Sequence, residues 1–166
     1  MTLGGIDDSK KLSAKERERL YHRIRACAVV GVGIVEHDEI DRLNIYWARM
    51  KAMELAVAAL ATAPAHVLVD GNRGPRWDRP TTCIVGGDGI SLSIGAASII
   101  AKHTRDQIMI AHAETWPQYD WATNKGYPAP KHLKALKEHG PCPLHRRTFN
   151  RVAQAELDFG LPEAAE

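Results

Sequence analysis

Two short stretches decide the fold: His66-Val-Leu-Val-Asp-Gly-Asn72 and Cys83-Ile-Val-Gly-Gly-Asp88. In each, apolar residues lead directly to an aspartate beside glycine, which is typical of a buried strand that ends in a sharp turn. We therefore expect Asp70 and Asp88 at strand ends. Two such carboxylates suit a phosphodiesterase site, because carboxylate oxygens hold Mg²⁺ or Mn²⁺ and the metals hold phosphate. Alone, each aspartate is more often a turn residue than a ligand, and Asp88 could cap the following helix.

Around these stretches the sequence alternates between helix and strand patterns. Ser13 and Glu16 form a capping box, and Asp38 or Asp41 is expected to cap a longer helix. The small residues from Gly95 to Ser98 would let a third helix approach the sheet or the site. The expected helices cover residues 13–25, 38–60, 91–112 and 130–139, and β-rich residues 26–35 predict a further strand. This alternation predicts an α/β fold.

Composition narrows the class of protein. The chain has 166 residues, 45% of them hydrophobic and 25% charged, which is typical of a single globular domain. No apolar run is long enough to span a bilayer, and the first residues do not resemble a signal peptide. Three widely spaced cysteines fit a reducing compartment better than a disulfide framework. We therefore expect a cytoplasmic protein.

The charge is unevenly distributed along the chain. The formal net charge is only +2, yet residues 124–151 carry seven Lys or Arg against one acid, and residues 9–25 carry seven against two. Two basic regions that flank an acidic, metal-capable centre suit a polyanion whose backbone is held while one bond is cut. Either basic run alone is also consistent with a solvated helix face.

A second set of possible ligands lies near the C-terminus. His139, Cys142 and His145 follow the pattern H-x2-C-x2-H, which hints at zinc. Three ligands this close, interleaved with prolines and without a fourth partner, make a structural zinc site improbable. The sequence also lacks the glycine-rich loops of nucleotide-binding proteins.

Six fragments, taken in order, resemble bacterial ribonuclease HII, the type 2 ribonuclease H. They are Asp8-Ser-Lys-Lys-Leu-Ser13, residues 67–73, Val85-Gly-Gly-Asp88, residues 93–106, Lys125-Gly-Tyr-Pro128 and His145-Arg-Arg-Thr-Phe149. The resemblance runs from about Gly5 to Val152. It implies a ribonuclease H-like mixed sheet with flanking helices, in one domain over residues 1–152 that includes the C-terminal basic substrate-binding region. Residues 153–166 would form a short tail.

The resemblance also implies an activity and its residues. Members of this family degrade the RNA strand of RNA–DNA hybrids and cut 5′ of ribonucleotides embedded in DNA, using two Mg²⁺ or Mn²⁺ ions. Asp70 and Asp88 match two of the family's four metal-binding, catalytic carboxylates. Tyr127 matches the tyrosine that stacks at the ribose of the RNA–DNA junction, and Lys102 and Arg146 fall in basic motifs that suit phosphate contacts. Asp106 also matches, but in mid-helix we interpret it as structural.

The chain departs from the family pattern at its N-terminus. The family begins with a hairpin that carries an Asp-Glu pair and a Gly-Arg-Gly loop, and no counterpart precedes Asp8. Two of the four carboxylates are thereby missing, as are the two middle strands of the sheet. Three hypotheses follow: an upstream start that restores the hairpin, a catalytically inactive nucleic-acid-binding protein, or a fragment completed by strands from another chain.

Overall fold

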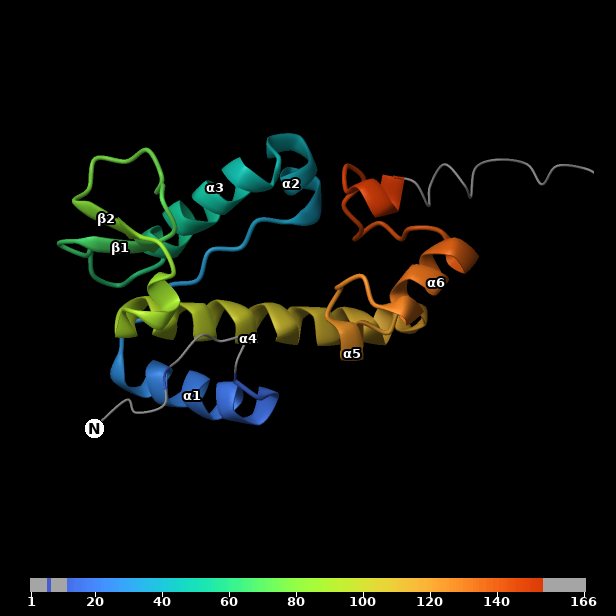
Figure 1. Cartoon of the computed structure of the whole chain (residues 1–166), viewed down its shortest axis with the longest axis horizontal. Coiled ribbons are helices and arrows are strands. Elements are labelled where there is room, and N and C mark those ends of the chain that lie inside the picture. The colour runs from blue at the N-terminus through green and yellow to red at the C-terminus, as the bar shows by residue number, and fades with distance from the viewer. Residues whose placement is uncertain (1–5, 7–11, 154–166) are drawn as a thin grey trace, which may run out of the picture. The chain divides into compact units, whose positions relative to one another are not determined.

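The computed structural model describes residue 6 and residues 12–153 (Figure 1). The chain divides into two compact units, the first formed by Met1–Ile34 and Arg49–Arg105, the second by Val35–Ala48 and Asp106–Glu166. The motif that begins at Asp8 and most of the predicted tail lie outside the described residues. The single domain expected over residues 1–152 stays a prediction.

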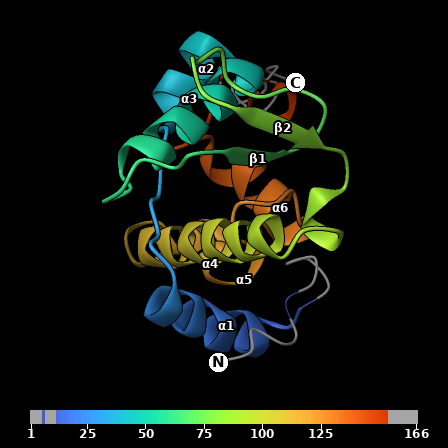
Figure 2. The same ribbon diagram turned by 90° about the vertical axis from the view of Figure 1, so that its left-hand side faces the viewer.

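In the first unit, a long helix packs against the N-terminal helix. Helix α1 (Ala14–Cys27) begins as predicted, because the Ser13 hydroxyl accepts a hydrogen bond from the Glu16 N–H and the Glu16 side chain reaches back to Ser13. Helix α4 (Leu92–Thr115) lies between α1 and the strands in both views (Figure 2). Apolar side chains of the two helices form the core of this unit, namely Leu20, Ile24, Ile99 and Ile100.

The sheet has two parallel strands in the described part of the chain. Strand β1 (Val67–Asp70) pairs with β2 (Thr81–Ile84), with Val67 opposite Thr81 and Asp70 opposite Ile84. Both strands lie where the sequence placed them, and the fold is α/β as predicted. The sequence also predicted a third strand, which this sheet does not contain among the described residues.

The expected strand at residues 26–35 was wrong. Residues 26 and 27 end α1, and residues 28–36 run without strand pairing. Within the first unit this segment lies against helix α3 (Ile45–Ala58), so closely that a Cβ added at Gly31 would clash with the Ala56 carbonyl oxygen. A helix already uses its own backbone groups, so it offers the segment packing but no ladder hydrogen bonds.

The expected helix over residues 38–60 is divided in two. Helix α2 (His37–Leu43) ends at Asn44, whose φ of 65° breaks the helical path, and α3 starts anew at Ile45. The Asn44 Oδ1 accepts hydrogen bonds from the N–H groups of Tyr46 and Trp47, so Asn44 caps α3. The prediction that Asp38 or Asp41 caps this helix was wrong. Asparagine tolerates left-handed backbone and supplies a capping oxygen, which explains the break.

The second unit is built around buried aromatic rings. A single turn at Pro117–Tyr119 leads into the short helix α5 (Trp121–Asn124), and α6 (Pro130–His139) follows at the predicted position. The core of this unit is formed by Tyr119, Trp121, Ala135, Leu136, Cys142 and Val152. The Tyr119 hydroxyl donates a 2.7 Å hydrogen bond to the Gly140 carbonyl, which fixes the end of α6. No helix in the described part of the chain is long and apolar enough to cross a membrane.

Candidate functional site

Asp70 lies at the carboxyl edge of the sheet. It is the last residue of β1, and the next N–H, that of Gly71, donates to the Ile84 carbonyl at 2.9 Å. Because β1 and β2 are parallel, their carboxyl ends lie at the same edge, where α/β sheets usually bind ligands. The Asp70 side chain is exposed there.

Glycines bring Asp88 to the same edge. After β2 the chain turns through Gly86, whose φ is 67°, into a single turn at Gly87–Gly89. The Gly87 N–H donates a 2.9 Å hydrogen bond to the Asp70 Oδ1. A Cβ at Gly87 would lie 2.5 Å from the Ile94 Cδ1, so this turn packs closely against α4. The structure therefore brings the turn of Asp88 against Asp70, as the two strand-end patterns predict.

Helix α4 closes one side of this edge. A Cβ added at Gly95 would lie 3.0 Å from the Asp88 carbonyl oxygen. This close approach confirms the expectation that the small residues after Ser93 let the helix backbone reach the site. Lys102 and Asp106 follow on the same helix, both partly buried. Lys102 belongs to the first unit, together with Asp70 and Asp88.

The carboxylate pair has the right chemistry for a hard divalent cation. Asp70 and Asp88 offer only oxygen atoms, which is the donor type that Mg²⁺ and Mn²⁺ prefer. Within the described residues, no three His, Cys, Asp or Glu side chains gather closely enough to hold a metal ion. The donor type of the two aspartates therefore fits such a metal, and the number of ligands that they supply is half of what the resemblance implies.

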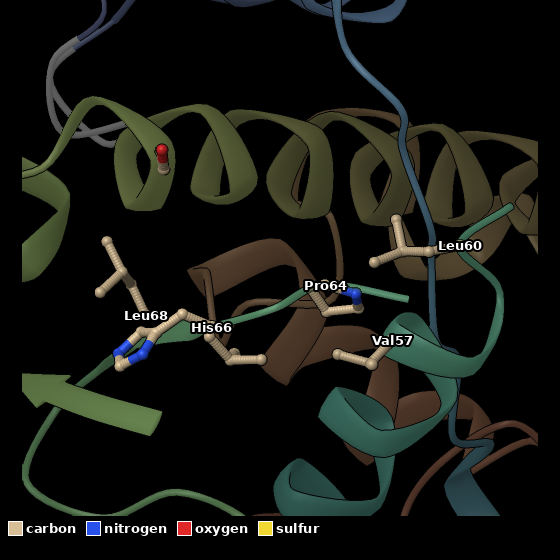
Figure 3. A pocket seen from close by; sticks show the side chains of 7 residues that line it. Val57, Leu60, Pro64, His66 and Leu68 are labelled. Carbon is tan, nitrogen blue, oxygen red and sulfur yellow. The ribbon is translucent and has the colours of Figure 1, made fainter. Parts of the chain in front are cut away.

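A separate hollow in the first unit is apolar. It has a volume of about 420 Å³, and Figure 3 shows its side chains converging from the end of α3, from β1 and from α4. The residues that line it are Val57, Leu60, Pro64, His66, Val67, Leu68 and Ser93. No carboxylate lines the hollow, so it is distinct from the Asp70–Asp88 edge.

Tyr127 and Arg146 both belong to the second unit, where each lies on a turn. The turn of Tyr127 has two residues with positive φ, Lys125 at 52° and Gly126 at 78°, and the Tyr127 side chain is 52% exposed. The Arg146 guanidinium lies over the Phe149 ring, with its Cζ 4.9 Å from the ring centroid. Nothing in this arrangement tests the substrate roles of Tyr127, Arg146 and Lys102, which stay predictions.

Asp41 holds the backbone that follows Arg146. Its carboxylate accepts hydrogen bonds from the N–H groups of Arg147 and Thr148 and from the Thr148 hydroxyl. Burial alone would raise the pKa of Asp41, but these hydrogen bonds outweigh it and hold the pKa below its usual value. Asp41, expected to cap a helix, instead positions the loop of Arg146.

The second unit also contains a buried histidine pair that the sequence patterns do not predict. The Nε2 atoms of His132 and His145 are 3.1 Å apart, and Cys142 contacts His145 at its other ring nitrogen. His139, the expected third member of the H-x2-C-x2-H pattern, is exposed instead. Burial and the neighbouring His132 lower the pKa of His145 to about 4. One signal was available: His132 shares a helix face with Ala135 and Leu136, both of which are buried.

Comparisons with known proteins agree on one family. The model of the family described as Ribonuclease HII matches residues 1–152. The Ribonuclease HII of Rhizorhabdus wittichii is 58% identical over 153 residues, which are 92% of this chain and 76% of that protein. The Ribonuclease HII of Novosphingobium aromaticivorans is 53% identical over 164 residues, covering 92% of this chain and 84% of that protein.

A solved structure shares the fold. The crystal structure of the ribonuclease H2 from Pyrococcus horikoshii OT3 superposes with a TM-score of 0.75, covering 93% of this chain and 82% of that one. Their sequences are 24% identical, so this likeness concerns the fold alone. The fold predicted from the resemblance is thereby confirmed.

Proposed function

This chain belongs to the ribonuclease HII family, and we propose that it is an endoribonuclease that degrades the RNA strand of RNA–DNA hybrids and cuts 5′ of ribonucleotides embedded in DNA. The observation that carries the proposal is the 2.9 Å hydrogen bond from the Gly87 N–H to Asp70. This bond joins the family's two aspartate motifs at one sheet edge. The chemistry is hydrolysis of a phosphodiester bond.

Asp70 and Asp88 are proposed as ligands of Mg²⁺ or Mn²⁺. When bound, such ions supply an activated water and neutralise the developing charge on the phosphate and leaving oxygen. The task of the protein is then to fix the two carboxylates. The Gly87 N–H orients Asp70 by occupying its Oδ1, while the turn at Gly86 and the close packing of α4 fix Asp88.

The remaining ligands are proposed to come from the family's N-terminal strands. Among the described residues, β1 pairs with β2 along one edge only, so its other edge can accept a strand. Leu68 on this strand is 41% exposed, and the hollow beside it is lined mainly by apolar side chains (Figure 3). A strand pair that carries an Asp-Glu would cover this apolar surface and bring carboxylates to the edge of Asp70.

The substrate is proposed to be held by residues outside the carboxylate edge. Tyr127 would place its exposed ring against the ribose, where the 2′-hydroxyl distinguishes RNA from DNA. Lys102 and Arg146 would contact phosphates, a role that suits the basic residues 124–151. We also place the protein in the cytoplasm, because all three cysteines are free thiols.

A cleavage assay tests the proposal on the chain joined at its N-terminus to the family's Asp-Glu hairpin, because the 166-residue chain alone supplies only two of the proposed carboxylate ligands. Three duplexes of one sequence are compared: an RNA–DNA hybrid, a DNA duplex with one embedded ribonucleotide, and an all-DNA duplex. With Mg²⁺ or Mn²⁺ we expect cuts in the RNA strand and 5′ of the single ribonucleotide, none in DNA, and none with EDTA. Binding of the hybrid without cleavage under either metal would contradict the proposal and favour the catalytically inactive nucleic-acid-binding alternative.

A further inference from the structure

We propose that the buried pair His132 and His145 is a positioning device that ties the turn of Tyr127 to the loop of Arg146. The inference rests on the proposed function, because it concerns how that function's two substrate-binding side chains are held. Both histidines are buried, with exposed fractions of 6% each. Neither is adjacent to the carboxylates in sequence, and no substrate role follows from the motifs for either of them.

His132 fixes the backbone of Tyr127. Its Nδ1 lies 2.9 Å from the Tyr127 carbonyl oxygen, which also accepts a 2.8 Å hydrogen bond from the Ala129 N–H. On the other side of the turn, Asn124 accepts hydrogen bonds from the N–H groups of Gly126 and Tyr127. The backbone of the turn is therefore held at both ends, while the Tyr127 ring is presented at the surface.

His145 fixes the start of the Arg146 loop. Its Nδ1 accepts a 3.1 Å hydrogen bond from the Cys142 N–H and lies 3.2 Å from the Cys142 Sγ. The next residues of the loop, Arg147 and Thr148, are held by Asp41. Arg146 thus lies between two anchored points of the backbone.

The network admits one consistent placement of protons. Because the His145 Nδ1 accepts from the Cys142 N–H, the neutral ring carries its proton on Nε2 and donates it to the His132 Nε2. The His132 Nε2 is therefore an acceptor, as the 3.3 Å bond from the Trp121 indole N–H also requires. The proton of His132 must then sit on Nδ1, where it is donated to the Tyr127 carbonyl.

The direction of these hydrogen bonds favours a positioning role for the histidine pair over a catalytic one. A neutral pair whose ring nitrogens are all engaged has no free nitrogen to exchange protons with a substrate. Burial holds the pKa of His145 at about 4, so the His145 ring stays neutral near pH 7. Rings of Tyr119 and Trp121 enclose it, with the Tyr119 centroid 4.7 Å from that of His145. The pair acts through Tyr127 and Arg146 and does not touch the substrate itself.

Two substitutions at His132 separate its two hydrogen bonds. In His132→Asn the side-chain amide can replace the Nδ1–H donor to Tyr127 but cannot reach His145. In His132→Gln the amide lies near the Nε2 position and leaves the Tyr127 carbonyl without this donor. The matched control is His139→Gln, because His139 is an exposed histidine on the same helix. Tyr127→Ala reports the full effect of losing the ring.

The readout is the ratio of two dissociation constants, measured by fluorescence anisotropy in EDTA for the all-DNA duplex and for the duplex with one ribonucleotide. We expect His132→Gln to reduce this preference about fivefold, while His132→Asn and His139→Gln keep it within twofold. A His132→Gln protein that keeps the preference while Tyr127→Ala loses it would overturn the inference and leave the proposed function intact. If Tyr127→Ala keeps the preference, the substrate role of Tyr127 is wrong and the inference falls with it.

A second measurement does not depend on whether the variants fold. Long-range ¹H–¹⁵N spectra of the unmodified protein distinguish the two neutral forms of each imidazole. We expect His132 with its proton on Nδ1 and His145 with its proton on Nε2. The reverse forms, or a charged His132 at pH 7, would contradict the network on which the inference stands.

Discussion

The carboxylate edge of the first unit and the histidine network of the second are built on opposite principles. At the edge, Asp70 is exposed and its Oδ1 accepts one hydrogen bond from a glycine N–H. In the network, His132 and His145 are buried, and every ring nitrogen has a partner. An exposed Asp70 beside a half-buried Asp88 can accept a ligand, whereas a fully paired buried network holds its surroundings in one arrangement. The carboxylate edge is therefore suited to bind a metal ion, and the histidine network is suited to hold the Tyr127 turn and the Arg146 loop in place.

The largest expected effect is at the carboxylate edge. Asp70→Asn or Asp88→Asn removes a negative charge and a metal ligand, so we expect metal-dependent cleavage to fall about 100-fold or more, with little change in hybrid binding. Asp78→Asn, in the exposed loop between the strands, is the matched control. Initial rates and anisotropy on the same hybrid measure both quantities. Activity that survives both changes would refute the two-metal interpretation.

Loss of a buried hydrogen bond in the core around the histidine pair should lower the free energy of unfolding. Tyr119→Phe removes the hydroxyl that donates to the Gly140 carbonyl and leaves that buried acceptor unpaired, which costs about 1–3 kcal/mol of unfolding free energy. Tyr21→Phe removes a hydrogen bond from the exposed Arg25 and should change stability by less than about 0.5 kcal/mol. Urea unfolding of both variants gives the comparison. Equal losses of unfolding free energy would show that the buried hydrogen bond contributes no more to stability than the exposed one.

Acidification should destabilise the second unit through His145. The pKa of His145 is about 4 in the folded chain and 6.5 when unperturbed, so between these values the unfolded chain binds a proton that the folded chain does not. Stability therefore falls as the pH is lowered from 6.5 towards 4. The pKa of the Asp41 carboxyl lies below 3.8, so the stability that this group contributes is lost only at still lower pH.

Thermal unfolding at several pH values measures this slope. In His145→Asn the titrating group is gone, so the slope between pH 6.5 and 4 should flatten, whereas His139→Gln should leave it unchanged. A slope that is the same in His145→Asn and the unmodified protein would place its origin elsewhere.

The smallest expected effects are those of single phosphate contacts. Lys102→Ala and Arg146→Ala should each weaken binding of hybrid and all-DNA duplexes alike and reduce the slope of log K against log salt by about 1. Glu138→Ala, on the exposed face of α6, removes an acid and should not reduce the slope. A loss confined to the ribonucleotide-containing duplex would instead make the residue part of ribose recognition.

Short sequence patterns predicted the structural features that depend mainly on residues close together in the chain. The Ser13–Glu16 capping box placed the start of α1, and the strand-end aspartates predicted the meeting of Asp70 with the turn of Asp88. The strand prediction failed at residues 28–36 because their strand propensity finds no pairing partner in the described chain. The His132–His145 contact was missed because it arises only when α6 buries one face against a loop 13 residues away.

The central claim, that Asp70 and Asp88 hold a divalent metal at one sheet edge, is tested most directly by titrating Mn²⁺ into ¹⁵N-labelled protein. The paramagnetic ion broadens amide signals close to it and needs no catalytic turnover. We predict that the N–H signals of Gly71, Gly87 and Gly89 broaden first and that Asp70→Asn suppresses this broadening. Broadening that starts elsewhere in the chain, or persists unchanged in Asp70→Asn, would contradict the account.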